Sequence, residues 1–265
     1  MLEITAFESR RRVRGTLYFA VALLAYSGLV LAIFPSIEAA ATDIQSYIES
    51  LPPEVRRAFG GEAATYTTIE GFLAAEMYQF VFLLLLGMYF AYAAASTIAS
   101  EAERGSIAPL LANPVTRTRV VVGKYLSLVP SMLALNAVLL VGTYYGVILV
   151  GETIDLADLA LLHALSLPYL LACAGLGLVA SVLFDSARRA QTVGAGGVFA
   201  MFLVDAVTFD TDYEWLGDVA FSRYFDPAEI LVDADVDWAG IAFLLVAAVV
   251  LVVLSAELFE RADVS

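Results

Sequence analysis

Long apolar runs separated by short polar stretches make up most of the chain. Six runs are long enough to cross a hydrocarbon layer of about 30 Å as a helix, which takes about 20 residues. They cover residues 15–34, 77–100, 120–150, 156–184, 190–209 and 238–258. The third run exceeds one perpendicular crossing, so we expect its helix to tilt or to project beyond the membrane. The pattern predicts an all-α integral membrane protein in which residues 1–265 form a single domain with six transmembrane helices.

The basic residues fall unevenly on the two sides that these runs define. Eleven of the 14 lie in the N-terminal segment, the second and fourth connections and the C-terminal segment, and three lie on the other side. Because cytoplasmic segments carry the excess of Lys and Arg, we expect both termini to be cytoplasmic. Nineteen of the 28 acidic residues lie in the three outer segments.

The polar segments carry shorter patterns of their own. Before the first run, which ends at Pro35, the alternation of apolar and charged residues predicts a short helix lying on the membrane surface, and a solvated tail is the alternative. Its apolar residues are Leu2, Ile4, Phe7 and Val13. The first outer segment predicts helices over residues 39–50 and 54–59. The last outer segment contains the apolar stretch 215–225, which we expect to dip into the membrane interface.

The composition excludes several classes of protein. Of 265 residues, 61% are apolar and 16% are charged, whereas soluble domains have about 45–50% and about 25%. A soluble enzyme is excluded because too few polar residues are left to cover its surface. The net charge of −14 disfavours nucleic-acid binding, which needs clustered Lys and Arg. Lys124 is the only lysine, and an acidic, lysine-poor chain indicates a high-salt habitat such as that of a haloarchaeon.

Few residues offer catalytic or ligand-binding chemistry. One cysteine and one histidine can form neither a disulfide within the chain nor a zinc cluster. His163 and Ser166 share a helix face and Asp205 lies within a run. We expect structural roles for all three, with a place along a solute path as the alternative for Asp205. The only Gly-Lys pair, Gly123-Lys124, lacks the other residues of a phosphate-binding loop. We therefore expect no enzymatic activity, metal or cofactor in this chain.

The segment 101–119, between the second and third runs, has the most informative pattern. Ser106 can cap a short helix with Pro109 in its first turn, and Pro114 ends it. The apolar residues Ile107, Leu110 and Leu111 share one side of this helix. An apolar surface rimmed by charges in a cytoplasmic loop favours docking into the groove of a partner, and packing against its own chain is the alternative.

This segment resembles the signature region of ABC-2 type permeases, the membrane subunits of ATP-driven transporters. The residues that match the pattern in order are Glu101, Glu103, Gly105, Ser106, Leu110, Leu111, Pro114, Arg117, Gly123 and Lys124. The segments LPPEVRRAFGG, TTIEGFLAAE and FSRYFDPAEIL resemble outer loops of the same family, so the resemblance covers most of the chain. The chain departs from the family at residues 107–109, where a run of Leu or Glu is common.

The resemblance implies that the chain is the permease subunit of an ABC exporter in the cell membrane. A cytoplasmic coupling helix would contact a separate ATP-hydrolysing subunit. Two membrane subunits, identical or different, would pair to form the path. The residues expected to couple to the ATPase are Glu101, Glu103, Arg104, Gly105, Ser106, Ile107, Leu110, Leu111, Pro114 and Arg117. The resemblance implies neither the transported substrate nor the residues that line the path.

The residues alone leave two other classes open. A secondary transporter or channel would use ionisable groups at mid-depth, and the runs contain almost none. A membrane scaffold would need no path at all. Small residues such as Gly142 and Gly146 favour close packing of helices within the chain, and a seam between two subunits is the alternative.

Overall fold

The computed structural model describes residues 2–40, 47, 50–52, 55, 68–105 and 116–261, and its secondary structure in these ranges is entirely helical. Six helical stretches are long and apolar enough to cross a membrane. They are Thr5–Ala39, Ile69–Glu103, Arg117–Leu149, Leu156–Leu183, Ala187–Thr208 and Trp238–Arg261. The prediction of an all-α protein with six spans is therefore confirmed.

The first span belongs to helix α1 (Leu2–Ala39), which runs without interruption from the N-terminal segment. The predicted end of the helix at Pro35 is wrong, because α1 continues for another turn with Pro35 inside it. A proline this close to the end of a helix removes one backbone hydrogen bond without interrupting a long helical ladder, so the cost stays local. The residues before the first span are thus part of the same helix rather than a separate one.

The second span starts at Ile69 rather than Met77 and has three parts, α4 (Ile69–Leu73), η1 (Ala74–Leu86) and α5 (Gly87–Glu103). The hydroxyl of Thr68 caps the first turn by accepting a hydrogen bond from the N–H of Gly71 at 3.2 Å. The intervening η1 is π-helical over 13 residues, whereas most π-helical segments are single-turn bulges. The start was predicted too late because the apolar pattern gave no weight to this polar cap.

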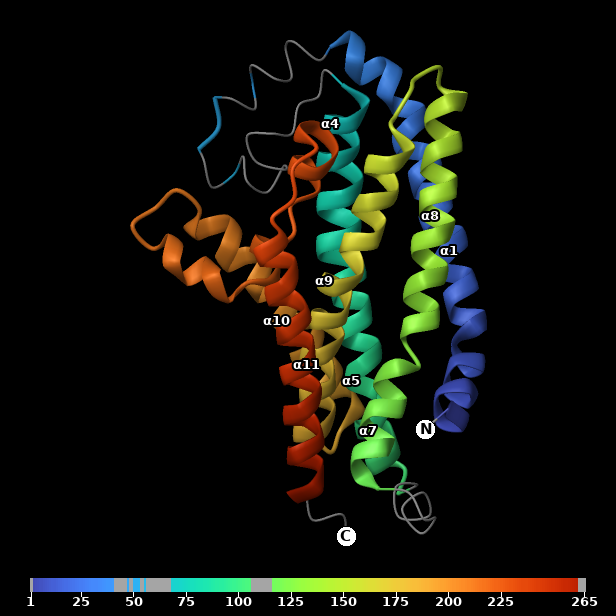
Figure 1. The fold of residues 1–265 in the computed structure, drawn as a ribbon, viewed down its shortest axis with the longest axis vertical. Coiled ribbons are helices and arrows are strands. Elements are labelled where there is room, and N and C mark those ends of the chain that lie inside the picture. Colours follow the sequence, from blue (N-terminus) through green and yellow to red (C-terminus); the bar gives the residue numbers. More distant parts are fainter. Residues whose placement is uncertain are drawn as a thin grey trace.

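The third span is two helices, α7 (Arg117–Leu126) and α8 (Val129–Leu149), and the expected single long helix is wrong. Pro130 lies in the first turn of α8. Proline has no backbone N–H, so it cannot donate to a carbonyl of the preceding turn, and the hydrogen bonds of α7 do not continue into α8. The last turn of α7 tightens instead, because the N–H of Leu128 donates to the carbonyl of Tyr125 at 3.1 Å. Figure 1 shows the offset between the two helices.

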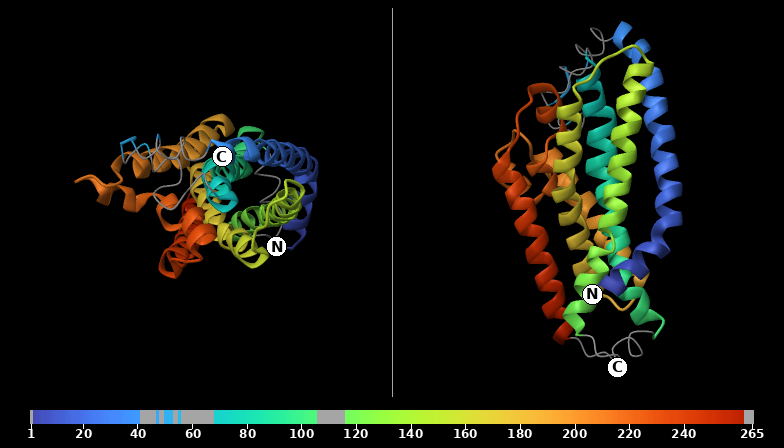
Figure 2. Two further views of the ribbon diagram at one scale, coloured as in Figure 1. Left: turned by 90° about the horizontal axis from the view of Figure 1, so that it is seen from above. Right: turned by 45° about the vertical axis from the view of Figure 1, so that its right-hand side comes forward.

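Helix α9 (Leu156–Leu183) lies at the centre of the bundle. It packs against α5, α10 (Ala187–Thr208) and α11 (Trp238–Arg261), whereas α1 packs mainly against α8 (Figure 2). The start of α1 and the end of α11 lie at the same end of the bundle, together with α7 (Figure 1). This arrangement brings the start of α1, the end of α11 and α7 to the region of the predicted coupling segment.

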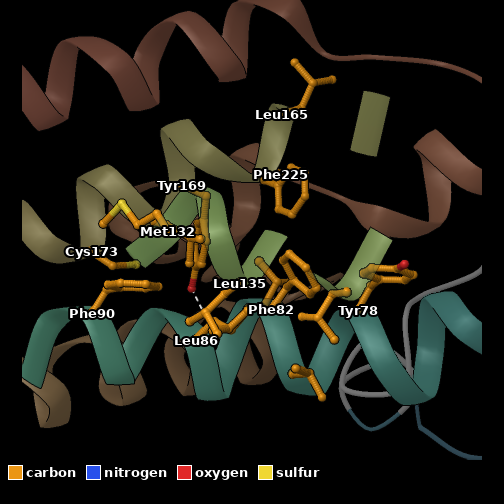
Figure 3. Packing of buried hydrophobic residues seen from close by; sticks show 14 of the residues in the cluster. Tyr78, Phe82, Leu86, Phe90, Met132, Leu135, Leu165, Tyr169, Cys173 and Phe225 are labelled. Carbon is orange, nitrogen blue, oxygen red and sulfur yellow. Dashed lines mark hydrogen bonds between the residues drawn. The ribbon is translucent and has the colours of Figure 1, made fainter. Parts of the chain in front are cut away.

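Aromatic side chains fill the core between η1, α5 and α9. Tyr78, Phe82 and Phe90 are fully buried. Phe82 and Phe90 lie on either side of Tyr169 of α9, and Tyr78 lies beyond Phe82 (Figure 3). The hydroxyl of Tyr169 donates a hydrogen bond to the carbonyl of Leu83 in η1, so this buried hydroxyl has a partner.

Three short helices connect α10 to α11: η2 (Glu214–Val219), η3 (Phe221–Tyr224) and η4 (Glu229–Asp233). In Figure 1 the orange part of this connection stands out sideways from the bundle. Tyr213 and Trp215 are 64% and 66% exposed there, and the predicted dip of this stretch into the membrane interface stays a prediction. The helices predicted over residues 39–50 and 54–59 fall largely outside the described residues.

Candidate functional site

The predicted coupling segment joins α5 to α7. Its central residues, 106–115, lie outside the described residues, and with them Ser106, Ile107, Leu110, Leu111 and Pro114. The structure describes the flanks, which contain Glu101, Glu103, Arg104, Gly105 and Arg117.

Lys124 of α7 lies at the centre of a buried ion cluster. Its side chain is 3% exposed, and its Nζ lies 2.7 Å from Glu101 Oε1 and 3.4 Å from Glu8 Oε1. The two carboxylates belong to α5 and α1, so one ammonium group joins three helices. A buried charge is tolerated only where partners replace the lost water, and here the two carboxylates replace it.

Glu103, in the last turn of α5, contacts the start of another helix. Its Oε2 accepts a hydrogen bond from the N–H of Ala187, the first residue of α10, at 3.2 Å. A carboxylate at this position satisfies a free N–H and complements the positive end of the helix dipole. The N-cap residue itself, Ser186, makes no side-chain cap. Glu103 therefore links α5 to α10.

Arg117, at the start of α7, holds the end of α11. Its Nη1 donates to the carbonyls of Phe259 at 2.8 Å and Glu260 at 3.2 Å. The guanidinium also lies over the ring of Phe259, 5.6 Å from its centroid. A cation at the last carbonyls of a helix satisfies acceptors that have no partner within the helix.

Arg104 and Gly105 end α5. Gly105 has φ +65°, in the left-handed region that glycine adopts without steric cost, and its N–H donates to the carbonyl of Ala102 at 3.0 Å. A Cβ on Gly105 would meet no atom within 4 Å, so backbone conformation and not space favours glycine here. Arg104 is exposed beside it.

The start of α1 is also fixed to α7. The hydroxyl of Thr5 donates to the carbonyl of Gly123 at 3.1 Å, and the hydroxyl of Ser9 lies 3.1 Å from the carbonyl of Ser127, at the break between α7 and α8. The flanks of the coupling segment are thus connected to α1, α10 and α11.

A comparison with protein families shows the family to which the chain belongs. A family model described as "ABC-2 family transporter protein" matches residues 3–264, almost the whole length. The chain belongs to this family. Permeases of the ABC-2 family are membrane components that generally work with an ATPase subunit. A search of curated proteins found no match.

Inside the bundle, this ABC-2 family protein contains a buried polar cluster around Asn136 of α8. Asn136 Oδ1 lies 3.0 Å from His163 Nδ1 and accepts a hydrogen bond from the hydroxyl of Ser166 at 2.9 Å. The other ring nitrogen of His163 lies 3.2 Å from the hydroxyl of Tyr78 in η1. The cluster joins η1, α8 and α9. The sequence singled out His163 and Ser166 but gave no indication that Asn136 lies between them.

Asp205 of α10 is buried against the α10–α11 connection of the ABC-2 family chain. Its Oδ2 accepts a hydrogen bond from the hydroxyl of Ser222 at 2.7 Å, and its Oδ1 lies 3.8 Å from a guanidinium nitrogen of Arg223. The same guanidinium pairs with Glu214 at 2.6 Å and Asp218 at 3.2 Å. These contacts make Asp205 part of an ion network with residues of the α10–α11 connection. The spacing of residues along the sequence could not show this pairing, since Arg223 lies 18 residues after Asp205.

Proposed function

We propose that the chain is the permease subunit of an ABC exporter and that segment 101–117 docks onto a separate ATPase subunit on the cytoplasmic side. Family membership supports the permease assignment. The observation that carries the coupling hypothesis is the anchoring of both flanks of the segment. Glu101 and Lys124 join α5 to α7, Glu103 contacts α10, and Arg117 contacts α11.

These contacts give the segment a mechanical role. ATP binding and hydrolysis move the ATPase subunit, and the docked segment moves with it. Because hydrogen bonds and ion pairs tie its flanks to other helices, a displacement of the segment shifts several helix ends together. The interruption at Ser127 and Leu128 lets α7 follow the ATPase while α8 keeps its packing in the bundle. Access to the path then switches between two packings of the helices.

The chain is expected to work together with a second membrane subunit and to have a defined orientation in the cell membrane. Two membrane subunits, identical or different, pair to form the path in the cell membrane of a halophilic organism. The excess of basic residues at one end supports a cytoplasmic location for both termini and the α5–α7 connection. The α10–α11 connection then lies outside, where its aromatic residues meet the interface.

Deletion of residues 105–113 tests the docking role. The full chain is purified from its native membranes in mild detergent, and ATP hydrolysis in the eluate is measured. Wild-type protein is expected to bring an ATPase with it, and the deletion is expected to lose it. A Leu110→Glu/Leu111→Glu variant keeps the length of the loop and should also lose the ATPase, because charge replaces the apolar contact.

The matched control is Arg188→Gln/Arg189→Gln, which alters two exposed residues in the first turn of α10, beside the other cytoplasmic connection. It should retain the ATPase. Retention of the enzyme by the deletion variant would disprove docking through this segment. Substrate transport by the reconstituted chain without any ATPase would show a secondary transporter or channel instead.

A further inference from the structure

A polar cavity of about 420 Å³ lies between α1, α5, α7 and α10, at the end of the bundle that contains the coupling flanks. Its size falls within the range of small-molecule sites, about 300–1,000 Å³. The charged side chains that line it are Glu8, Arg11, Arg12, Glu101, Arg104 and Lys124. Gln191 and three hydroxyl-bearing residues of α5 complete much of its wall.

The cavity is positively charged, whereas the chain as a whole is negatively charged. The whole chain has a net charge of −14 with only 14 basic residues, and four of those 14 line this one cavity. Both carboxylates in the wall lie within 3.4 Å of Lys124 and are partly neutralised by it. Two positive charges remain in excess, so the cavity attracts an anion in an otherwise acidic protein.

Arg12 provides a hydrogen-bond donor without a partner. Its Nε is buried, and no group in the part of the chain that the structure describes accepts a hydrogen bond from it. A buried donor of this kind costs free energy until an acceptor reaches it. Guanidinium presents several donors in a planar fork that matches the oxygens of a phosphate group.

We propose that this cavity binds a phosphate group, supplied by the headgroup of an anionic phospholipid. Basic pockets between transmembrane helices on the cytoplasmic side suit such headgroups. The next turns of α1 leave room for the rest of the lipid. Gly15, three residues after Arg12, has no atom within 4 Å of the position of a Cβ, and Tyr18 is 75% exposed one turn further. The inference goes beyond the proposed function, because it assigns a ligand that neither docking nor hydrolysis requires.

The test measures lipid retention by the full chain. Protein is exchanged into detergent micelles containing equal amounts of phosphatidylglycerol and phosphatidylcholine, and bound lipid is quantified by native mass spectrometry. Wild type should retain phosphatidylglycerol in preference to phosphatidylcholine. Arg12→Gln should bind it roughly tenfold or more weakly, because a charged hydrogen-bond donor is lost. Gln191→Glu, which adds a negative charge to the opposite wall, should weaken binding independently.

Arg14→Gln is the matched control, since it removes an exposed arginine of the same helix that does not line the cavity. It should bind like wild type. A second arm adds inorganic phosphate, with chloride at the same ionic strength as its reference. Protection against thermal unfolding by phosphate, lost in Arg12→Gln and without lipid retention, would assign the site to a free phosphate compound. Equal lipid retention by all four proteins, or no binding of either probe by wild type, would overturn the proposal. No ATPase is present, so this outcome is independent of the docking experiment.

Discussion

The side chain of Lys124 joins α1, α5 and α7 at the end of the bundle where the coupling segment begins. It is the only lysine of the chain and is almost fully buried between two carboxylates. Removing one partner of a buried ion pair is far more costly than removing an exposed one, because the remaining charge loses both its water and its partner.

Lys124→Met should therefore lower the free energy of unfolding by about 3–5 kcal/mol, measured by denaturation of the purified chain in detergent. The comparison is Arg261→Gln, which breaks a pair whose side chains are 81% and 62% exposed. That variant should change stability by less than about 1 kcal/mol. Equal effects of the two substitutions would contradict a stabilising role for the buried cluster.

Asn136 links two helices inside the bundle, where its Oδ1 contacts both His163 and Ser166 of α9. Asn136→Ala leaves the polar groups of both neighbours without this acceptor in an apolar surrounding. We expect a loss of about 1–3 kcal/mol. Thr192→Ala is the control, since its hydroxyl donates only to the carbonyl of Arg188 within its own helix and is exposed. Unfolding midpoints that coincide for the two variants would show that the cluster adds no stability.

At the scale of elements, small residues decide which helices come close. A Cβ on Gly142 would overlap the side chain of Leu24, and one on Gly146 would overlap that of Leu31, so both glycines face α1. The alternative of a subunit seam at this pair is not needed to explain them. Gly177 is more tightly placed, because a Cβ there would overlap the backbone carbonyl of Ala91 in α5.

Gly177→Ala should push α9 away from α5 and lower the free energy of unfolding by about 1–3 kcal/mol, since a backbone atom cannot rotate away as a side chain can. Gly196 of α10 offers a matched comparison, because no atom lies within 4 Å of its Cβ position. Gly196→Ala should be neutral or stabilise by up to about 1 kcal/mol through its higher helix propensity. Thermal unfolding in detergent measures both. A Gly177→Ala protein as stable as wild type would contradict the close contact of α5 and α9.

At the scale of the whole molecule, the dominant feature is the separation of charge along the bundle. Acidic residues gather in connections away from the termini, as in the described stretch 226–237, and basic residues gather at the end that contains the termini. A large net charge of one sign destabilises the folded state through self-repulsion. Salt weakens this repulsion, because the Debye length falls from about 10 Å at 0.1 M to about 3 Å at 1 M.

Raising KCl from about 0.1 M to about 1 M should therefore increase the thermal midpoint of the purified chain. The ion pairs of Arg223 are screened as well, which reduces the gain without reversing it, because acidic residues outnumber basic ones two to one. Asp233→Asn/Asp235→Asn, which removes two acidic charges from the α10–α11 connection, should show a smaller increase in the thermal midpoint. A midpoint that stays constant or falls with salt would argue against repulsion and against a protein adapted to high salt.

Much of this architecture was predictable, and the exceptions have specific causes. The six spans follow from apolar runs. In lipid, the N–H and C=O groups of the backbone must form hydrogen bonds within the helix, and the side chains around it must be apolar. The break before Pro130 had a visible signal in the proline itself, but the apolar pattern continued across it and predicted one helix. The start of the second span at Ile69 depended on a cap by Thr68, a polar residue outside the apolar run. The centre of the coupling segment, residues 106–115, lies outside the described residues, so its predicted helix stays a prediction.

The sequence by itself determined the number of spans, the separation of charge and the resemblance to ABC-2 permeases. Each of these properties depends on consecutive residues, because a membrane span or a local motif can be recognised within a single segment. Only the tertiary structure decided which polar groups meet. Lys124 reaches Glu8 across 116 positions, and His163 reaches Asn136 across 27. Such pairs form because helix packing brings distant residues together, and the packing depends on all the apolar faces at once rather than on any one of them.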